Sequence, residues 1–190
     1  MRMGEWLSGM KRLKIILALI IIFLVFSAAG TVGAADAGWL AAGLRGGIDD
    51  NRNLDEDYRQ FEAFALYDLP WSWQVSSAST VGTCVEGNLG FLSSSGRYGV
   101  VGSVGPSVYL RTFNKRLFII GGINATLISR DEYGDDDFGG PFQFTSHIGL
   151  NYRFGDHLSI GYRLQHMSNA GIYDKNPGIN FNMLELGYFF

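Results

Sequence analysis

Hydrophobic and polar residues alternate through long stretches of the chain after about residue 38. Between residues 142 and 154, one parity is mostly apolar and the other mostly polar. The apolar set is Phe142, Phe144, Ile148, Leu150, Tyr152 and Phe154, and the polar set is Gln143, Thr145, His147, Asn151 and Arg153. Residues 98–110 and 117–127 repeat the pattern. A period of two places successive side chains on opposite faces of a β-strand, so these segments are predicted to be strands with one apolar face.

Eight segments of this kind follow one another along the chain. Strands are predicted near residues 39–48, 58–69, 73–92, 98–111, 116–128, 141–154, 157–168 and 179–190. Tight turns are predicted at Leu69-Pro70-Trp71, Thr112-Phe113-Asn114-Lys115 and Gly155-Asp156. Longer polar connections are predicted at residues 49–57, 130–140 and 169–178, whereas the connection 93–97 is short and fits this alternation less well. Alternation of short and long connections is typical of membrane barrels, and eight strands close the smallest common one.

Alternation also occurs in soluble β-sandwiches, so the lipid-facing interpretation needs other support. The chain ends in Gly187-Tyr188-Phe189-Phe190, and a terminal aromatic strand is associated with outer-membrane barrels. We therefore predict an all-β protein, an eight-stranded antiparallel transmembrane β-barrel. Recognition by the barrel-assembly machinery is expected to involve Phe190.

The first 35 residues have the pattern of a secretory signal. Four basic residues (Arg2, Lys11, Arg12 and Lys14) precede an apolar run over 15–26, and small residues follow over 32–35. The run is shorter than the roughly 20 apolar residues that a membrane-spanning helix needs. We expect a cleaved signal peptide over 1–35, with a retained anchor as the alternative, and a barrel domain over 36–190. The expected location is the outer membrane of a Gram-negative cell.

The net charge of the chain argues against one class of partner, and its cysteine content argues against disulfide bonds. The chain has 15 Lys and Arg and 18 Asp and Glu, and without residues 1–35 it keeps 11 and 17, a net charge of −6. Nucleic acid is not expected as a partner at this charge. The single cysteine, Cys84, cannot form an internal disulfide and is expected to be a small apolar filler.

Acidic clusters fall in the long connections. They are Asp49-Asp50, Asp55-Glu56-Asp57 and Asp135-Asp136-Asp137. Carboxylates here could bind Ca²⁺ and bridge lipopolysaccharide phosphates, because hard cations take several oxygen ligands. Solvated loops explain the clusters more simply, so no metal site is predicted.

The apolar parity of the seventh predicted strand becomes polar at its outer end. Leu158, Ile160, Tyr162 and Leu164 are followed on the same parity by His166 and Ser168. Residues two apart on a strand lie about 6.6–6.8 Å apart at Cα, so the two side chains can meet. In the antiparallel eighth strand, Asn180 has the same outward parity at the same height. Polar groups facing lipid are costly and usually functional, so this group is a candidate serine–histidine site.

The residues around this group resemble a known family. The stretch from Tyr162 to Ile172, followed by residues 176–180, resembles the C-terminal signature of the PagL-type lipid A 3-O-deacylases. Residues 144–154, with Ser146-His147-Ile148-Gly149, are also similar to that family. The resemblance covers residues 142–190 and is only architectural before them.

The resemblance implies an activity and a role for each residue. The substrate would be lipid A in lipopolysaccharide, hydrolysed without a cofactor at the ester-linked 3-hydroxyacyl chain of position 3. Ser168 would be the nucleophile and His166 the general base, and the oxyanion donors would be the Asn169 side chain and the Gly171 backbone N–H. The family has a glutamate where this chain has Asn180.

The change to Asn180 leaves the third role open. An amide can orient an imidazole but does not offset the imidazolium charge, so the orienting role could also lie elsewhere. Asp174 is the nearest loop carboxylate, whereas Glu185 has inward parity.

Two other functions remain open. One is a non-catalytic structural barrel in which His166 and Ser168 belong to the interfacial girdle. The other is a lipid A palmitoyltransferase, for which no interior acyl pocket is evident. Acyl-chain preference, latency in the protein's own membrane and a homodimer are left undecided by the sequence.

Overall fold

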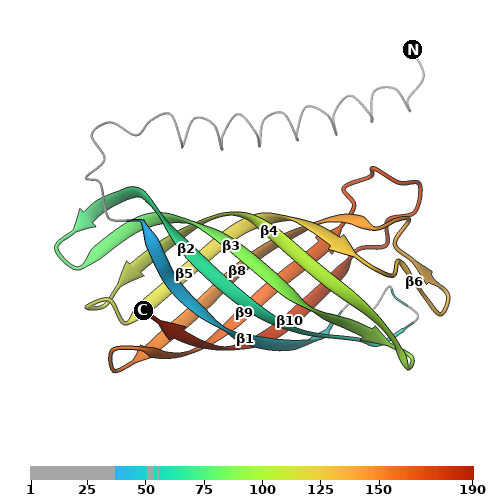
Figure 1. Cartoon of the computed structure of the whole chain (residues 1–190), viewed down its shortest axis with the longest axis horizontal. Helices are drawn as coiled ribbons and strands as arrows, with labels where there is room; N and C mark the ends of the chain where they lie inside the picture. Colours follow the sequence, from blue (N-terminus) through green and yellow to red (C-terminus); the bar gives the residue numbers. More distant parts are fainter. Residues whose placement is uncertain (1–36, 51–53, 55) are drawn as a thin grey trace, which may run out of the picture. The chain divides into compact units, whose positions relative to one another are not determined.

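The computed structural model describes residues 37–50, 54 and 56–190, and it confirms the predicted barrel (Figure 1). The predicted signal peptide over 1–35 lies outside the described residues, as does Asp55. The strands are β1 (Gly38–Asp49), β2 (Tyr58–Ser76), β3 (Ser79–Ser94), β4 (Arg97–Thr112), β5 (Leu117–Ile128), β6 (Glu132–Tyr133), β7 (Asp136–Asp137), β8 (Phe142–Phe154), β9 (Leu158–Ser168) and β10 (Ile179–Phe189). Eight of them form a closed barrel in the order β1-β10-β9-β8-β5-β4-β3-β2, and β6 pairs with β7 in a separate hairpin. In the described part of the chain, no helix is long and apolar enough to cross a membrane.

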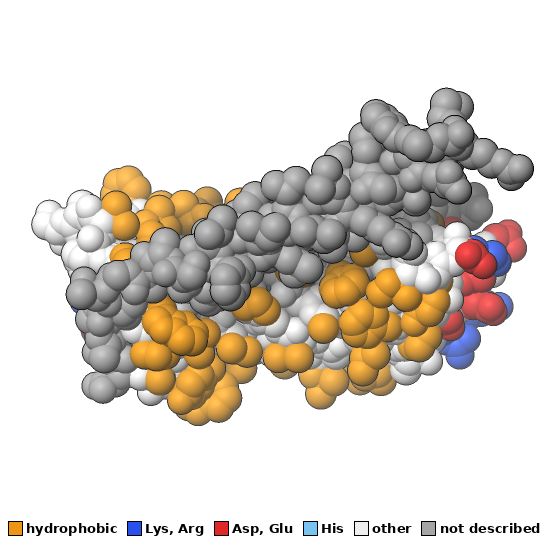
Figure 2. All heavy atoms as spheres, turned by 90° about the horizontal axis from the view of Figure 1, so that it is seen from above, with side chains coloured by type: hydrophobic (Ala, Val, Ile, Leu, Met, Phe, Trp, Pro, Cys, Tyr) orange, Lys and Arg blue, Asp and Glu red, His pale blue; other side chains and the backbone are white. Residues whose placement is uncertain are grey.

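The two parities of each strand face opposite environments, as predicted. In β9, Leu158, Ile160, Tyr162 and Leu164 are exposed on the outside, whereas Arg163 and Gln165 are buried. Figure 2 shows hydrophobic side chains along the barrel wall and charged side chains gathered at the end that carries β6 in Figure 1. An apolar wall with charges at one end is what a barrel surrounded by lipid requires.

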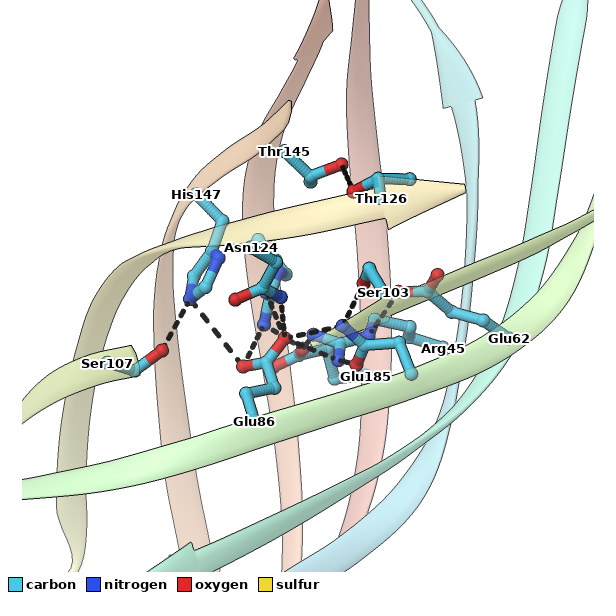
Figure 3. A network of polar contacts seen from close by, with 12 residues as sticks. Arg45, Glu62, Glu86, Ser103, Ser107, Asn124, Thr126, Thr145, His147 and Glu185 are labelled. Carbon is cyan, nitrogen blue, oxygen red and sulfur yellow. Dashed lines mark hydrogen bonds and ion pairs between the residues drawn. The ribbon is translucent and has the colours of Figure 1, made fainter. Parts of the chain in front are cut away.

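The barrel interior contains a network of paired charges (Figure 3). The side chain of Arg45 forms ion pairs with Glu62 (2.7 Å), Glu86 (3.0 Å) and Glu185 (2.6 Å). Arg163 pairs with Glu86 and Glu185 as well. All five side chains are at most 3% exposed, so each charge depends on its partners in place of water.

The cavity beside this ion-pair network is very small. The cavity lined by Ala41, Phe64, Glu86, Arg163 and Glu185, among others, has a volume of about 10 Å³. That is room for about one water molecule. An acylated sugar therefore cannot occupy the barrel, and a substrate has to bind on the outer wall or at the loops.

One predicted turn is wrong. Leu69-Pro70-Trp71 is not a connection: β2 continues through it to Ser76, and the chain turns at residues 77–78 instead. The pairing of β2 with β3 shifts register between Asp68 and Ser72, so the irregular segment is a bulge in a continuous strand. Proline has no N–H to donate, and it is tolerated here because β1 pairs with β2 only as far as Asp68.

The loops differ from the prediction in one detail. The polar connection after β5 contains the short β6–β7 hairpin, which the sequence pattern did not reveal. The connection between β3 and β4 is as short as predicted, with Ser95 and Gly96 both at positive φ. Such a pair fits the two-residue turn that matches the twist of a β-hairpin.

Leu184 tests the lipid-facing register. It lies at the middle of β10 and is 65% exposed on the outer wall. We expect Leu184→Arg to lower the free energy of unfolding in bilayers by about 2–4 kcal/mol, because the charge enters hydrocarbon near the midplane. Urea titration in lipid vesicles measures the change. Leu184→Ala is the control for loss of the side chain, and an equal loss in both variants would place Leu184 away from the hydrocarbon.

Candidate active site

The outer end of β9 places His166 and Ser168 on the lipid-facing side of the wall. Their side chains meet as the spacing predicted: the His166 Nε2 atom lies 3.1 Å from the Ser168 Oγ atom. The His166 side chain is exposed and Ser168 is half-buried, so both remain accessible from outside the barrel. A hydroxyl at this distance from an imidazole nitrogen can give up its proton during nucleophilic attack.

Asn180 holds the other side of the imidazole ring. The register of β9 and β10 pairs Asn180 directly with His166, and the Asn180 Oδ1 atom lies 2.7 Å from His166 Nδ1. An amide oxygen only accepts, so Nδ1 carries the proton that is donated to it. His166 Nε2 is then the acceptor that faces Ser168 Oγ, which is the tautomer that a general base needs.

Gly178 allows the loop to pass close to the ring. It has φ of +69°, and a Cβ added to it would lie 3.1 Å from His166 Cε1. A side chain here would be strained by the backbone angle and would press on the imidazole. The glycine at the start of β10 therefore helps to fix where His166 sits.

An open groove lies beside the histidine. It has a volume of about 440 Å³ and is lined by residues of β8, β9 and β10 and by the residue that follows β1: Asp50, Ser146, His147, Ile148, Leu164, Gln165, His166, Asn180 and Phe181. Ser146 of β8 lies opposite His166 in the strand pairing, and Ile148 lies opposite Leu164. The groove is thus polar at the level of His166 and apolar one step further along the wall.

The loop after Ser168 is folded onto itself by Asn169. This side chain is fully buried, and its Nδ2 donates to the carbonyl oxygens of Phe138 (2.9 Å) and Lys175 (2.6 Å). Its Oδ1 accepts from the Gly171 backbone N–H at 2.8 Å. Both donors that the resemblance assigned to the oxyanion are engaged within the loop in this structure. The Ala170 N–H, between them, has no partner among the described residues, and Ala170 has a positive φ of 55°.

The same loop is tied to the β6–β7 connection. Lys175 Nζ lies 2.7 Å from Asp137 Oδ2, and the Tyr173 hydroxyl accepts from the backbone N–H of Phe142. The hydrogen bond from Lys175 holds the pKa of the Asp137 carboxyl below its usual range, with help from the Gly139 N–H. These contacts hold the loop of residues 169–178 in place beside Ser168.

The two carboxylates that the sequence analysis weighed for the orienting role, Asp174 and Glu185, lie away from the groove. Glu185 points into the barrel interior, as its parity predicted, and Asp174 is exposed in the loop and does not line the groove. Sequence reasoning assigned Asp50 to an acidic loop cluster but missed that it lines the groove. The signal was hidden because β1 and β10 are far apart in the chain and become neighbours only when the barrel closes.

Two carboxylates of the acidic loop clusters bind neighbouring groups within the protein. Asp136 accepts from the Tyr58 hydroxyl at 3.1 Å and from the backbone N–H of Glu56 at 3.3 Å, and Asp137 pairs with Lys175. Over the described residues, no group of three or more His, Cys, Asp or Glu side chains is placed to hold a metal ion. Asp136 and Asp137 thus act in this structure as partners of neighbouring groups.

Comparisons with known proteins agree on one family. The family described as lipid A 3-O-deacylase (PagL) matches residues 59–189. The lipid A deacylase PagL of Bordetella bronchiseptica is 41% identical over 76 residues, which are 40% of this chain and 43% of that protein. The lipid A deacylase PagL of Pseudomonas aeruginosa is 37% identical over 62 residues, 33% of this chain and 36% of that protein. The aligned part of the chain thus spans less than half of each curated relative.

The fold has a solved counterpart. The crystal structure described as that of the outer membrane enzyme PagL superposes with a TM-score of 0.67 at 21% identity, covering 77% of this chain and 97% of that one. The similarity of folds agrees with the family match, which extends over most of the barrel. The chain belongs to the PagL family of lipid A 3-O-deacylases.

Proposed function

We propose that this protein is an outer-membrane lipid A 3-O-deacylase that works as a serine esterase. The observation that supports the proposal most directly is the chain of contacts from Ser168 Oγ to His166 to Asn180 on the lipid-facing wall. The two bacterial relatives are lipid A deacylases, and this supports lipid A as the substrate class. Because the interior is filled, the substrate lies along the outer wall with its acyl chains in the hydrocarbon.

The reaction follows from this placement. The Ser168 oxygen attacks the ester carbonyl while its proton passes to His166 Nε2, and the sugar hydroxyl leaves with that proton. Water then loses a proton to His166 and attacks the acyl-serine, which releases the 3-hydroxy fatty acid and restores Ser168. No cofactor is needed for either step.

Donors for the oxyanion have to come from the loop after Ser168. We propose that the Asn169–Gly171 segment supplies them, as the family resemblance implies. The Ala170 N–H has no partner in the described part of the chain, and the Gly171 N–H can turn to the oxyanion if it exchanges its bond with the Asn169 side chain. Such donors stabilise the negative charge that develops on the carbonyl oxygen.

The proposal has a direct test. Purified protein is incubated with lipopolysaccharide, and the lipid A is analysed by mass spectrometry. The proposed function gives loss of one 3-hydroxyacyl chain from position 3. Unchanged lipid A would favour the structural barrel, and gain of palmitate would favour the palmitoyltransferase; either result refutes the proposal.

Three expectations about processing and partners stay predictions. Removal of residues 1–35 as a signal peptide would precede insertion into the outer membrane. Insertion would depend on recognition of Phe190 by the barrel-assembly machinery. A homodimer in the membrane would be detected by cross-linking.

Asn180 offers a test of the orienting role. We expect Asn180→Ala to lower deacylation about tenfold to a hundredfold, because the imidazole loses the partner that fixes its tautomer. Asn180→Asp should raise the rate at neutral pH and move the acid limb of the pH–rate profile upward, because a carboxylate stabilises the protonated ring. Initial rates across pH measure both. If the alanine variant matches the wild type and the aspartate variant shifts neither rate nor profile, Asn180 has no role in orienting the base.

A further inference from the structure

Asp50 is held against the outer face of β10 at the level of the proposed site. It follows β1 directly, and its backbone N–H donates to the Asn180 carbonyl oxygen at 3.1 Å. Its Oδ2 accepts from Asn182 Nδ2 at 2.8 Å, and Asn182 Oδ1 in turn accepts from the Tyr162 hydroxyl. Both the main chain and the side chain of Asp50 are therefore fixed beside the residue that holds His166.

The groove brings this carboxylate together with the histidine. Asp50, His166 and Asn180 line the same groove, and Asp50 is the one acidic residue among the groove-lining residues. Ile148 and Leu164 line it as well, so part of its wall is apolar. A charge beside apolar side chains and lipid is screened less than one in bulk water.

The site needs a negative charge that Asn180 does not provide. When His166 accepts the serine proton it becomes positive, and Asn180 can hold its Nδ1–H but carries no charge. The other groups named around the ring do not supply this negative charge. Ser146 on β8 and Asn182 on β10 are neutral, Lys175 is paired with Asp137, Asp174 does not line the groove, and His147 is buried on the inward side.

We propose that Asp50 supplies the carboxylate of the site, so that the role of the third residue of a serine–histidine triad is divided between Asn180 and Asp50. Asn180 orients the imidazole by a direct hydrogen bond, and Asp50 stabilises the imidazolium through the groove and through its hold on β10. Asp50 is thus a positioning and electrostatic residue, not a catalytic one, because it does not touch the reacting atoms. The inference rests on the proposed deacylase activity.

Asp50→Asn separates charge from structure. An asparagine keeps the backbone N–H and an oxygen that can accept from Asn182, but it removes the negative charge. We expect kcat to fall about tenfold with KM little changed, and the acid limb of the pH–rate profile to move to lower pH. Asp135→Asn is the matched control, since it removes the same charge from an exposed position in an outer loop; its rate and profile should stay at wild-type values.

Rescue provides the decisive comparison. Asn180→Asp in the Asp50→Asn background returns a carboxylate to the site, and it should restore most of the lost kcat and move the acid limb back upward. A purely structural role for Asp50 would give Asn180→Asp the same proportional effect on kcat in the Asp50→Asn background as in the wild type, whereas the proposal requires a larger gain in the Asp50→Asn background. Wild-type kcat and profile in Asp50→Asn, or a loss that Asn180→Asp leaves unrepaired, would overturn the proposal.

Two further measurements check that the variants fold and that the wild type is active. Heat-dependent migration in gel electrophoresis shows that each barrel is closed, and Asp50→Ser replaces Asp50→Asn in every comparison if the latter does not fold. The wild-type assay separates the two proposals: a wild type without deacylase activity overturns the proposed function, whereas an active wild type with an equally active Asp50→Asn overturns only the role of Asp50.

Discussion

Replacing Ser168 by alanine is expected to abolish deacylation while the barrel stays folded. The variant removes the oxygen that lies 3.1 Å from His166 Nε2, and no other hydroxyl is bonded to that nitrogen among the described residues. Loss of the nucleophile in a serine–histidine site costs several orders of magnitude in kcat, so the rate should fall by about 10³-fold or more. Mass spectrometry of lipid A after incubation with purified variant measures the residual activity.

His166→Ala should be equally inactive, and the double variant should be no worse than either single one. Residues that act as a unit show this non-additivity, because the base has no function without the nucleophile. Ser77→Ala is a useful control, since Ser77 is exposed in the turn between β2 and β3 and does not line the groove. Near-normal hydrolysis by Ser168→Ala or His166→Ala would rule out the serine esterase mechanism.

The second large effect is expected from the barrel interior. Arg45 contacts three buried glutamates, and Arg45→Met would leave Glu62, Glu86 and Glu185 with Arg163 as the remaining guanidinium of the network. Removing one side of a buried ion pair leaves an uncompensated charge, so the free energy of unfolding should fall by about 3–5 kcal/mol. Urea unfolding in vesicles, followed by gel mobility, measures the loss.

Two variants control this prediction. Arg116→Met removes an exposed arginine near the turn before β5 and should change the free energy of unfolding by less than about 0.5 kcal/mol. Glu62→Gln added to Arg45→Met neutralises the carboxylate that lies 2.7 Å from Arg45 Nε, and it should recover part of the lost stability. If Glu62→Gln lowers the free energy of unfolding as much in the Arg45→Met variant as it does in the wild type, the ion-pair explanation is incorrect.

Much of the fold could be predicted because each strand has to satisfy lipid on one side and a polar interior on the other. A strand that meets both demands alternates apolar and polar residues, as Leu158, Ile160 and Arg163 do. This alternation predicted both the faces and the number of the barrel strands. Pro70 was misleading for a physical reason: it marks a turn in most contexts, but here it lies in a part of β2 that extends beyond β1. The β6–β7 hairpin is too short for any periodicity to reveal.

The site was partly predictable on the same grounds. His166 and Ser168 interrupt an apolar face within one strand, and Asn180 follows from the antiparallel register of two neighbouring strands. Asp50 could not be found in this way, because its position depends on closure between the first and last strands. The internal bonding of Asn169 was also hidden, since it depends on where the loop carbonyls of Phe138 and Lys175 come to lie.

The plugged interior has a consequence for the cell that carries this protein. Arg45, Arg163 and their glutamates lie buried inside the barrel, and the cavity that Glu86, Arg163 and Glu185 help to line has a volume of only about 10 Å³. Among the described residues, ions and small solutes would therefore meet a network of paired charges inside the barrel. Under the proposed function, abundant expression would add deacylase activity to the outer membrane without adding a wide, water-filled channel such as that of a porin.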